Sequence, residues 1–264
     1  MRRRKNHDRH RQGPNGAPGK VDGLPLYRML GAEALDIPAY NSKGLGMIGP
    51  DRAAEEALEL VEEGFHAINV RLGYPTPEED LAVVRAVWAA VPKGTVLISD
   101  YNQSQSVEDV IERVKMLDPE GLAWVEEPVR FDDFSGHAHV RAQVDTPIQT
   151  VENCWFPGDM EKCLSARACD FFMPDAGKIG GVTGWRRAAD LGREYDVSLS
   201  SHLYPEVSVH LLCATPTRHW LEYVDWAQQI LTEPLVVTHG HCRPPEKSGI
   251  GIEWDETAVN RYSV

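Results

Sequence analysis

The sequence has 264 residues, of which 42% are apolar and 25% are charged, and its formal net charge is −13. A chain of this length and apolar content can form one large globular core or two small domains, which excludes a disordered protein. The acidic balance argues against a general nucleic-acid binder, because such proteins need a basic face to neutralise phosphates. We therefore expect a small or metal-chelated partner and no nucleic acid.

The first twenty residues, MRRRKNHDRHRQGPNGAPGK, differ in composition from the rest of the chain. They contain seven Lys or Arg, one Asp, three Gly, two Pro and no aromatic residue. Such a segment cannot bury enough apolar surface to offset its chain entropy, so we expect residues 1–20 to be a disordered basic tail. A nucleic-acid-binding arm is the functional alternative, which the acidic remainder of the chain disfavours.

From residue 36 onward, short β-branched or apolar runs alternate with segments of helical periodicity. The strand candidates are 36–42, 65–72, 95–102, 121–128, 146–152, 170–175, 197–202 and 219–224. The helix candidates are 51–64, 76–91, 106–117, 132–143, 156–167, 183–194 and 206–214. Eight strands with helices between them fit an α/β fold of the TIM-barrel type better than an open sheet.

Acidic side chains occur where three consecutive strand candidates end. ISDYNQS ends the third strand at Asp100, WVEEP ends the fourth at Glu126 and Glu127, and IQTVEN ends the fifth at Glu152. In a barrel these carboxylates converge on the face where barrel enzymes carry their active sites. Converging carboxylates repel one another unless a hard cation lies among them, and oxygen-only ligands suit Mg²⁺ or Mn²⁺. The alternative is that they are ordinary solvated loop acids.

The later strands add further polar residues at their ends. MPDAGKIGG follows the sixth strand with Asp175 and Lys178, LSSHLYPE carries His202, and HWLEYV ends the eighth strand with Glu222. An Asp beside a His fixes the imidazole tautomer and raises its basicity, as a general base requires. A lone His at a strand end is more often structural, but the Asp on the preceding strand favours a catalytic dyad.

The motifs SDYNQS, WVEEP, VEN, MPDAGKIGGVTGW, SSHLYPE and ATPTRHWLEYVD together resemble the enolase superfamily, specifically its mandelate racemase subgroup. The resemblance runs from about Lys20 to the C-terminus and implies a modified (β/α)7β barrel over residues 21–264. It implies a Mg²⁺ site, with Mn²⁺ as an alternative. The implied metal ligands are Asp100, Glu126 and Glu152.

The resemblance also implies roles for the residues around the metal. His202 and Asp175 would form the base, and Glu222 would hydrogen-bond a substrate carboxylate as it becomes an enediolate. Asn102 and Ser42 match positions that contact the substrate, and Lys178 falls in the same substrate-binding set. The implied partner is a small carboxylate, and the family habit implies a homo-oligomer.

The stretch FHAINVRLGYP departs from the subgroup pattern. Members carry a Lys-x-Lys pair at the end of the second strand, and the second Lys is a base on the face opposite the His; here the pair reads Asn69-Val70-Arg71. Arg is effectively never a free base in a protein, whereas the pKa of Lys can be lowered by burial. Arg71 could instead bind a carboxylate with two hydrogen bonds or neutralise the nearby acids.

Family members carry an α+β capping domain before the barrel, and the resemblance leads us to expect only the basic tail in its place here. A barrel without this cap should have an open, wet site. Apolar surface that normally meets the cap should then be exposed and favour association, including parts of Leu24–Leu30 and of the C-terminal GIGIEWDE segment.

Three functions follow from the sequence. The first is a racemase-type isomerase that removes the α-proton of a 2-hydroxy carboxylate to give an enediolate. The second is an acid-sugar dehydratase that uses the His–Asp dyad alone, which suits Asn69 and Arg71 better. The third is an inactive or truncated metal-binding barrel. Overall similarity ranks the racemase first.

Five cysteines, at positions 154, 163, 169, 213 and 242, form no CxxC pair. They favour reduced thiols in a cytosolic protein and argue against zinc. No apolar run approaches the roughly eighteen residues that a membrane span needs, and the N-terminus lacks the apolar stretch of a signal peptide. The sequence predicts a cytoplasmic protein with no membrane partner.

Overall fold

The computed structural model describes residues 23–262, so the predicted tail at 1–20 lies outside the described residues. Strands and helices alternate in the predicted order. The eight barrel strands are β1 (Ile37–Asn41), β2 (Ala67–Arg71), β3 (Val96–Asp100), β4 (Val125–Glu126), β5 (Ile148–Thr150), β6 (Phe171–Phe172), β7 (Ser198–Leu199) and β8 (Leu221–Tyr223). The helices between them are α3 (Pro50–Glu62), α4 (Pro77–Ala90), α5 (Val107–Leu117), α6 (Phe134–Arg141), α7 (Phe156–Ser165), α8 (Gly181–Tyr195) and α9 (Pro205–Cys213).

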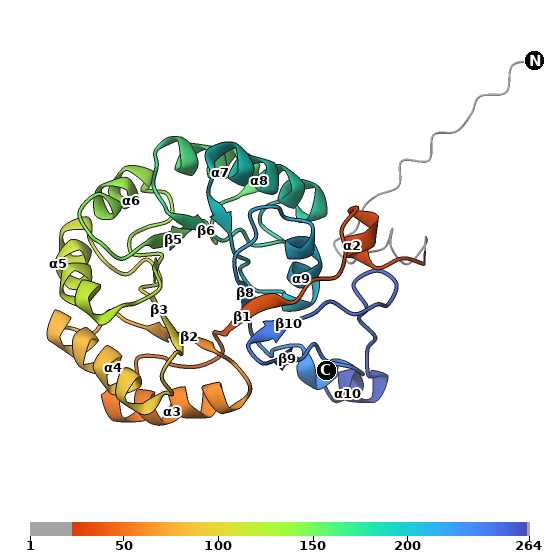
Figure 1. Cartoon of the computed structure of the whole chain (residues 1–264), viewed down its shortest axis with the longest axis horizontal. Helices are drawn as coiled ribbons and strands as arrows, with labels where there is room; N and C mark the ends of the chain where they lie inside the picture. Colours follow the sequence, from red (N-terminus) through yellow and green to blue (C-terminus); the bar gives the residue numbers. More distant parts are fainter. Residues whose placement is uncertain (1–22, 263–264) are drawn as a thin grey trace, which may run out of the picture.

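The eight strands form a closed ring of parallel strands (Figure 1). Neighbours pair in sequence order from β1 to β7, and β8 pairs with β1, with Tyr40 opposite Glu222. The remaining gap is bridged by backbone hydrogen bonds: Leu199 N donates to Thr217 O at 2.7 Å and Ser201 N donates to Trp220 O at 2.9 Å. The predicted α/β barrel is confirmed.

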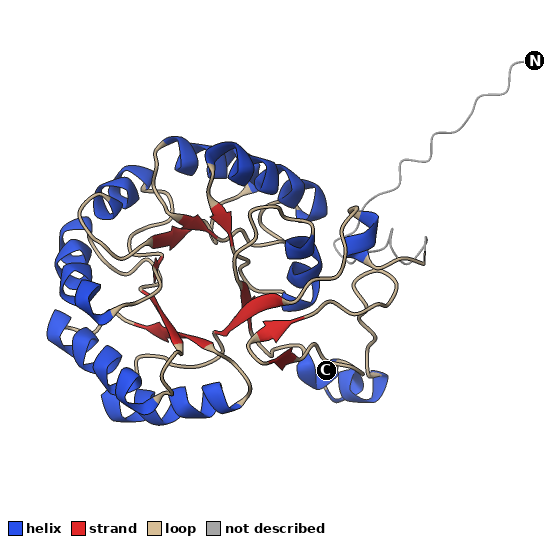
Figure 2. Cartoon of the chain, viewed as in Figure 1, coloured by secondary structure: helices blue, strands red, loops and turns tan. Residues whose placement is uncertain are grey.

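Helices surround the ring on its outer side (Figure 2). Their apolar side chains pack against the strands, as Val83, Val84 and Val87 of α4 do in a cluster with Ile68 and Leu97. Local sequence explains where they begin: α4 starts at Pro77 behind a capping box in which Thr76 and Glu79 exchange hydrogen bonds. The ring encloses packed side chains. Tyr40, Ala67, Ile98 and Trp124 form a buried cluster.

A buried carboxylate fixes the loop that follows β2. Asp80, on α4, accepts hydrogen bonds from Gly73 N and Tyr74 N, both at 2.9 Å, and from the Tyr101 hydroxyl at 3.1 Å. Arg113 on α5 pairs with the same carboxylate at 2.6 Å, and neither side chain is appreciably exposed. One charged pair therefore ties α4, α5 and the ends of β2 and β3 together.

A small lobe lies beside β1. Figure 1 shows its N-terminal helix in red and its C-terminal segments in blue. It contains α2 (Leu26–Met29), the hairpin β9 (Val237–Thr238) and β10 (His241–Cys242), and α10 (Glu256–Arg261). Two short 3-10 helices, η1 (Asp118–Glu120) and η2 (Gln228–Ile230), complete the elements. The strand β10 pairs antiparallel with the start of β1, so the C-terminal segment extends the sheet outside the ring.

The prediction that Leu24–Leu30 and the GIGIEWDE segment are exposed is wrong for part of this surface. Leu26 and Tyr27 are buried, as is Ile250, because the two segments cover each other: Leu26 N donates to Gly249 O at 2.7 Å. Only the edges of this surface match the prediction, with Leu24 and Trp254 exposed.

All five cysteines are free and buried, in agreement with the prediction of thiols. Among residues 23–262, no helix is both long and apolar enough to cross a membrane.

Candidate active site

The predicted site residues come together at the carboxyl ends of the strands. Arg71 lies beside Asp100 in the β2–β3 register, and Asp100 lies beside Glu126 in the β3–β4 register. Partners in a parallel register point to the same side of a sheet. The three side chains therefore share one end of the barrel, as the sequence predicted.

Two of the three predicted metal ligands are almost completely buried. Burial, together with the charges of Glu152 and Glu222, raises the pKa of Asp100 to about 7 even though the Arg71 guanidinium opposes the shift. Burial and then the charge of Asp100 raise the pKa of Glu126 well above its ordinary value. Such mutual repulsion marks a cluster that is short of positive charge.

The third predicted ligand, Glu152, lies in the loop after β5 and faces the base. Its Oε2 is 3.3 Å from His202 Nε2, and its Oε1 accepts a hydrogen bond from Asn153 Nδ2 at 2.7 Å. Within the described residues, no group of three or more acidic, His or Cys side chains is already arranged to hold a metal ion. A cation in this cluster therefore requires Glu152 to turn from His202 toward Asp100 and Glu126.

The predicted dyad is formed. His202 Nδ1 is 2.9 Å from Asp175 Oδ2, and both side chains are largely buried. Burial opposes the charged imidazole, but Asp175, Glu222 and Glu152 outweigh it and raise the pKa of His202 to about 9. Burial would also raise the pKa of Asp175, yet hydrogen bonds from His202 and from backbone amides keep it below its ordinary value.

Glu222 closes the site on the β8 side. Its Oε2 accepts a hydrogen bond from Leu203 N at 2.7 Å, so the backbone next to His202 is held against Glu222. Glu222 is 3% exposed and lies opposite Tyr40 in the β8–β1 register. The Tyr40 hydroxyl is buried without a hydrogen-bond partner.

The unusual strand-two pair faces the same end of the barrel. Arg71 Nη2 donates to Ser42 Oγ at 3.1 Å, and Arg71 Nε lies 3.6 Å from Asp100 Oδ2. Arg71 Nη1 and both amide atoms of Asn69 are buried without hydrogen-bond partners. Buried polar groups are normally paired, so the unpaired donors Arg71 Nη1 and Asn69 Nδ2 and the unpaired acceptor Asn69 Oδ1 indicate a place where a polar ligand or a water would bind.

Two predicted substrate contacts are engaged with other protein groups. Asn102 is exposed, and its amide donates to Asp100 Oδ2 at 2.6 Å. Lys178 Nζ donates to Asn153 Oδ1 at 2.8 Å. The sequence predicted that these residues belong to the site, but it did not predict their partners.

The sequence analysis placed Glu127 at a strand end but gave it no role, and the structure buries its carboxylate. Glu127 is 0% exposed; its Oε1 accepts hydrogen bonds from Thr150 Oγ1 at 2.5 Å and Val151 N at 3.0 Å. Burial and Glu152 raise the pKa of Glu127 to about 8, although these hydrogen bonds oppose the shift. Glu127 thus braces the loop that carries Glu152, and the doubled acid in WVEEP was the available signal.

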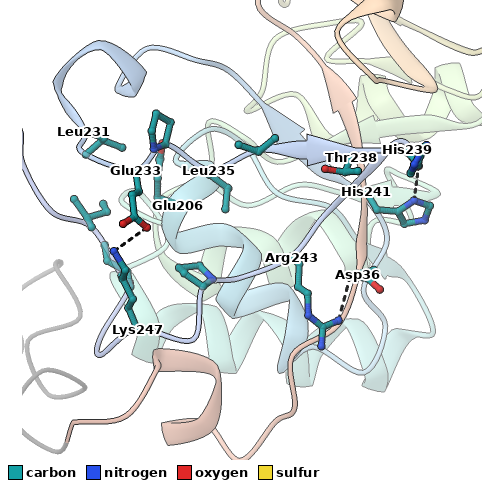
Figure 3. Close-up of a pocket in the computed structure, with 16 residues that line it drawn as sticks. Asp36, Glu206, Leu231, Glu233, Leu235, Thr238, His239, His241, Arg243 and Lys247 are labelled. Atoms are coloured by element: carbon teal, nitrogen blue, oxygen red, sulfur yellow. Dashed lines mark hydrogen bonds and ion pairs between the residues drawn. The ribbon is translucent and has the colours of Figure 1, made fainter.

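A separate cavity lies away from these residues. A cavity of about 710 Å³ opens between the β9–β10 hairpin and the following loop, and none of the predicted site residues lines it (Figure 3). Its charged groups include the pairs Lys247–Glu233 and Arg243–Asp36. This cavity is therefore separate from the predicted site residues at the strand ends.

A family model matches most of the chain. The model described as "Enolase C-terminal domain-like" aligns with residues 52–258. L-talarate/galactarate dehydratase from Salmonella typhimurium is 31% identical over 240 residues, which are 90% of this chain and 60% of the dehydratase. The chain thus spans about three fifths of the length of that relative.

Solved structures are similar over the same portion. An enolase from alphaproteobacterium BAL199 with bound Mg is 40% identical, with a TM-score of 0.91 over 93% of this chain and 69% of that one. An enolase from Bradyrhizobium complexed with magnesium and mandelic acid is 39% identical, with a TM-score of 0.88 over 94% of this chain and 68% of that one.

Proposed function

We propose, from the premise that this chain belongs to the enolase C-terminal domain-like family, that it removes the α-proton of a 2-hydroxy carboxylate. The observation that carries the proposal is the His202–Asp175 pair at 2.9 Å beside a cluster of buried carboxylates. Asp175 orients the ring so that Nε2 points toward the cluster, where a substrate α-carbon would present its proton.

The carboxylate cluster fits a hard divalent cation. Asp100, Glu126 and Glu152 offer only oxygen donors, and the mutual elevation of pKa in the cluster shows the charge that a cation would neutralise. We assign Mg²⁺ to these residues, with Mn²⁺ as a substitute. When bound, the ion would stabilise the enediolate charge and offset the carboxylates that hold a proton on His202.

The neighbouring residues bind and orient the substrate in this proposal. Arg71, supported by Ser42, holds a carboxylate or hydroxyl oxygen with its free Nη1, and the Asn69 amide supplies a further donor. Glu222, when protonated, donates a hydrogen bond to the carboxylate oxygen that gains charge. The roles of Arg71 and Asn69 use buried polar atoms that have no hydrogen-bond partner among the described residues.

Strand two favours dehydration over racemisation. An arginine stays protonated in proteins, so only His202 is available to move the α-proton. His202 Nε2 takes this proton, the C–O bond at the β-carbon breaks, and the proton leaves with the β-hydroxyl as water. The enol that forms becomes a 2-keto-3-deoxy acid. The dehydratase relative at 31% identity supports this reaction and acid sugars as the substrate class.

Racemisation is the second candidate function. A relative of 39% identity is described with magnesium and mandelic acid, a 2-hydroxy acid that has no β-hydroxyl to lose. Inversion requires protonation on the face opposite His202, and water would have to supply that proton here. The two reactions share α-proton removal and differ in the fate of the enediolate.

Proton NMR in D₂O tests both reactions through their shared step. The full chain and Mg²⁺ are incubated with both mandelate enantiomers and with a set of acid sugars, and loss of the α-proton signal is followed. We expect exchange or dehydration of an acid sugar, with one configuration consumed. H202N should reduce the rate by about 10²–10⁴-fold, as loss of a general base does.

The outcomes separate the candidates. A 2-keto-3-deoxy product, detected with semicarbazide, supports dehydration, whereas deuterium incorporation with inversion of mandelate supports racemisation. Equal activity of H202N and wild type would reject the assignment of the base. Mg²⁺ binding without exchange of any of these acids would reject both reactions in favour of a non-catalytic metal-binding barrel.

A further inference from the structure

Lys178 reaches a metal-ligand candidate through one intervening side chain. Its Nζ donates to Asn153 Oδ1 at 2.8 Å, and Asn153 Nδ2 donates to Glu152 Oε1 at 2.7 Å. An amide has one accepting end and one donating end, whereas an ammonium group only donates. Lys178 therefore fixes which end of Asn153 faces the carboxylate.

The backbone of Lys178 is held on both sides. Its N–H donates to Asp175 Oδ1 at 2.9 Å, and its carbonyl accepts a hydrogen bond from Phe156 N at 3.1 Å. The other oxygen of Asp175 contacts His202. The loop at residues 175–178 consequently positions the base at one end and the amide next to Glu152 at the other.

Asn153 is also held at the end of its amide that faces Glu152. Asn153 Nδ2 lies 3.4 Å from Glu127 Oε2, so the amide bridges two carboxylates. The backbone between these groups is strained, because the β-branched residue Val151 has a φ of 96°. Strain of this kind persists only where the surroundings fix the conformation.

We infer that Lys178 is a positioning residue which, through Asn153, holds Glu152 for metal binding. This inference rests on the proposed metal site and assigns Lys178 away from the substrate. Asn153 occupies Oε1, so the oxygen left for the cation is Oε2, which must turn from His202 Nε2, 3.3 Å away, toward Asp100 and Glu126. Without Lys178 the Asn153 side chain loses its anchor at Oδ1, so the amide and the Glu152 carboxylate that it holds become free to move.

Titration of the full chain with MgCl₂ alone, followed by calorimetry, tests this inference without substrate. K178M retains the aliphatic stem and removes the donor. We expect its Kd for Mg²⁺ to rise about 10–100-fold, the usual effect of losing an outer hydrogen bond to a metal ligand. K162M is the matched control, since Lys162 is exposed and pairs only with Asp159 within the described residues, and its Kd should match that of wild type.

Two further variants exclude a general loss of structure. K178R can still donate to Asn153 and should recover most of the affinity, with the Tm of K178M and wild type remaining close. N153A removes the same link from its other end, so the K178M/N153A double variant should bind Mg²⁺ no more weakly than the weaker single variant.

Wild-type Mg²⁺ affinity in K178M would overturn the inference, and a raised KM with that affinity would return Lys178 to substrate binding. Additive losses in the double variant would likewise overturn it. Failure of the wild-type chain to bind Mg²⁺ would instead reject the proposed metal site on which the inference depends. A loss of affinity in K178M and N153A that K178R restores supports it.

Discussion

At the scale of single residues, the site balances a surplus of negative charge against one imidazole and one guanidinium. His202 sits between Asp175 at 2.9 Å and Glu152 at 3.3 Å, which stabilises its protonated form. A base that starts protonated must lose its proton before catalysis. In the proposed reaction, neutralising the carboxylates would therefore be a precondition for proton removal and not only a means of stabilising the enediolate.

The metal-free protein should lose stability as the pH rises through the neutral range. The pKa of His202 is about 9 in the fold against 6.5 ordinarily, so its stabilisation is complete below pH 6.5 and lost by about pH 9. The pKa of Asp100 is about 7 in the fold against 3.8 ordinarily, so this carboxyl also makes stability fall as the pH rises, between about pH 4 and 7. Thermal unfolding in EDTA from pH 5 to 9 measures the decline.

His202→Asn isolates one part of this effect. Asn cannot be protonated, so the variant should show a smaller decline between pH 6.5 and 9 while keeping the decline at lower pH that Asp100 causes. A curve with the wild-type slope above pH 6.5 would contradict the pKa elevation of His202.

The identities of the site residues were predictable from the sequence, but their contacts were not. Asp100, Glu126 and His202 follow from polar residues at the ends of apolar runs, because parallel strands converge at one edge. The rotamer that turns Glu152 to His202, and the Lys178–Asn153 bond, depend on distances between separate loops. Strand-end patterns carry no information about those distances.

At the scale of elements, the loop after β2 depends on one buried ion pair. R113M removes the guanidinium and keeps much of the stem, which leaves the Asp80 carboxylate buried without its counter-charge. We expect the free energy of unfolding to fall by about 3 kcal/mol, as when one partner of a buried pair is removed. Urea denaturation measures this change.

The control for this variant is R130M, since the pair Arg130–Asp132 is exposed on both sides. R130M should unfold at nearly the urea concentration of wild type, because exposed pairs contribute little. An equal effect of the two substitutions would show that Asp80 is stabilised by its backbone and Tyr101 hydrogen bonds alone.

The barrel elements were predicted well and the lobe was not. The seven long helices have clear apolar periodicity, and the eight strands are separated by turn residues, so their order followed from pattern alone. The hairpin of β9 and β10 has only two residues in each strand, and α2 has four. Such short elements form because β1 and the C-terminal segment present partners, which a local pattern does not show.

At the scale of the whole molecule, exposed apolar side chains occur at the barrel end that carries the candidate site. Met47, Trp155, Phe156, Tyr204 and Trp226 are each more than half exposed. All five follow the carboxyl ends of barrel strands: four lie in the segments after β1, β5, β7 and β8, and Phe156 begins α7. An apolar rim of this kind is typical of a surface that contacts another protein surface.

We expect the chain to self-associate through this rim, in line with the predicted homo-oligomer. Sedimentation velocity over a range of concentrations should show a dimer or larger species. The variant W226S/F156S should shift the equilibrium toward monomer, and L58S, at an exposed position on α3, provides the control. A wild-type chain that stays monomeric at high concentration would contradict this expectation.

The closure of the ring by β8 on β1 has a consequence for synthesis on the ribosome. The first strand emerges early, but its partner Leu221–Tyr223 leaves the exit tunnel only after most of the chain has been translated. Until then β1 presents an unpaired edge, and such edges recruit strands from other chains. The nascent protein should therefore depend on holding chaperones until Leu221–Tyr223 has left the exit tunnel, after which closure removes their binding surface.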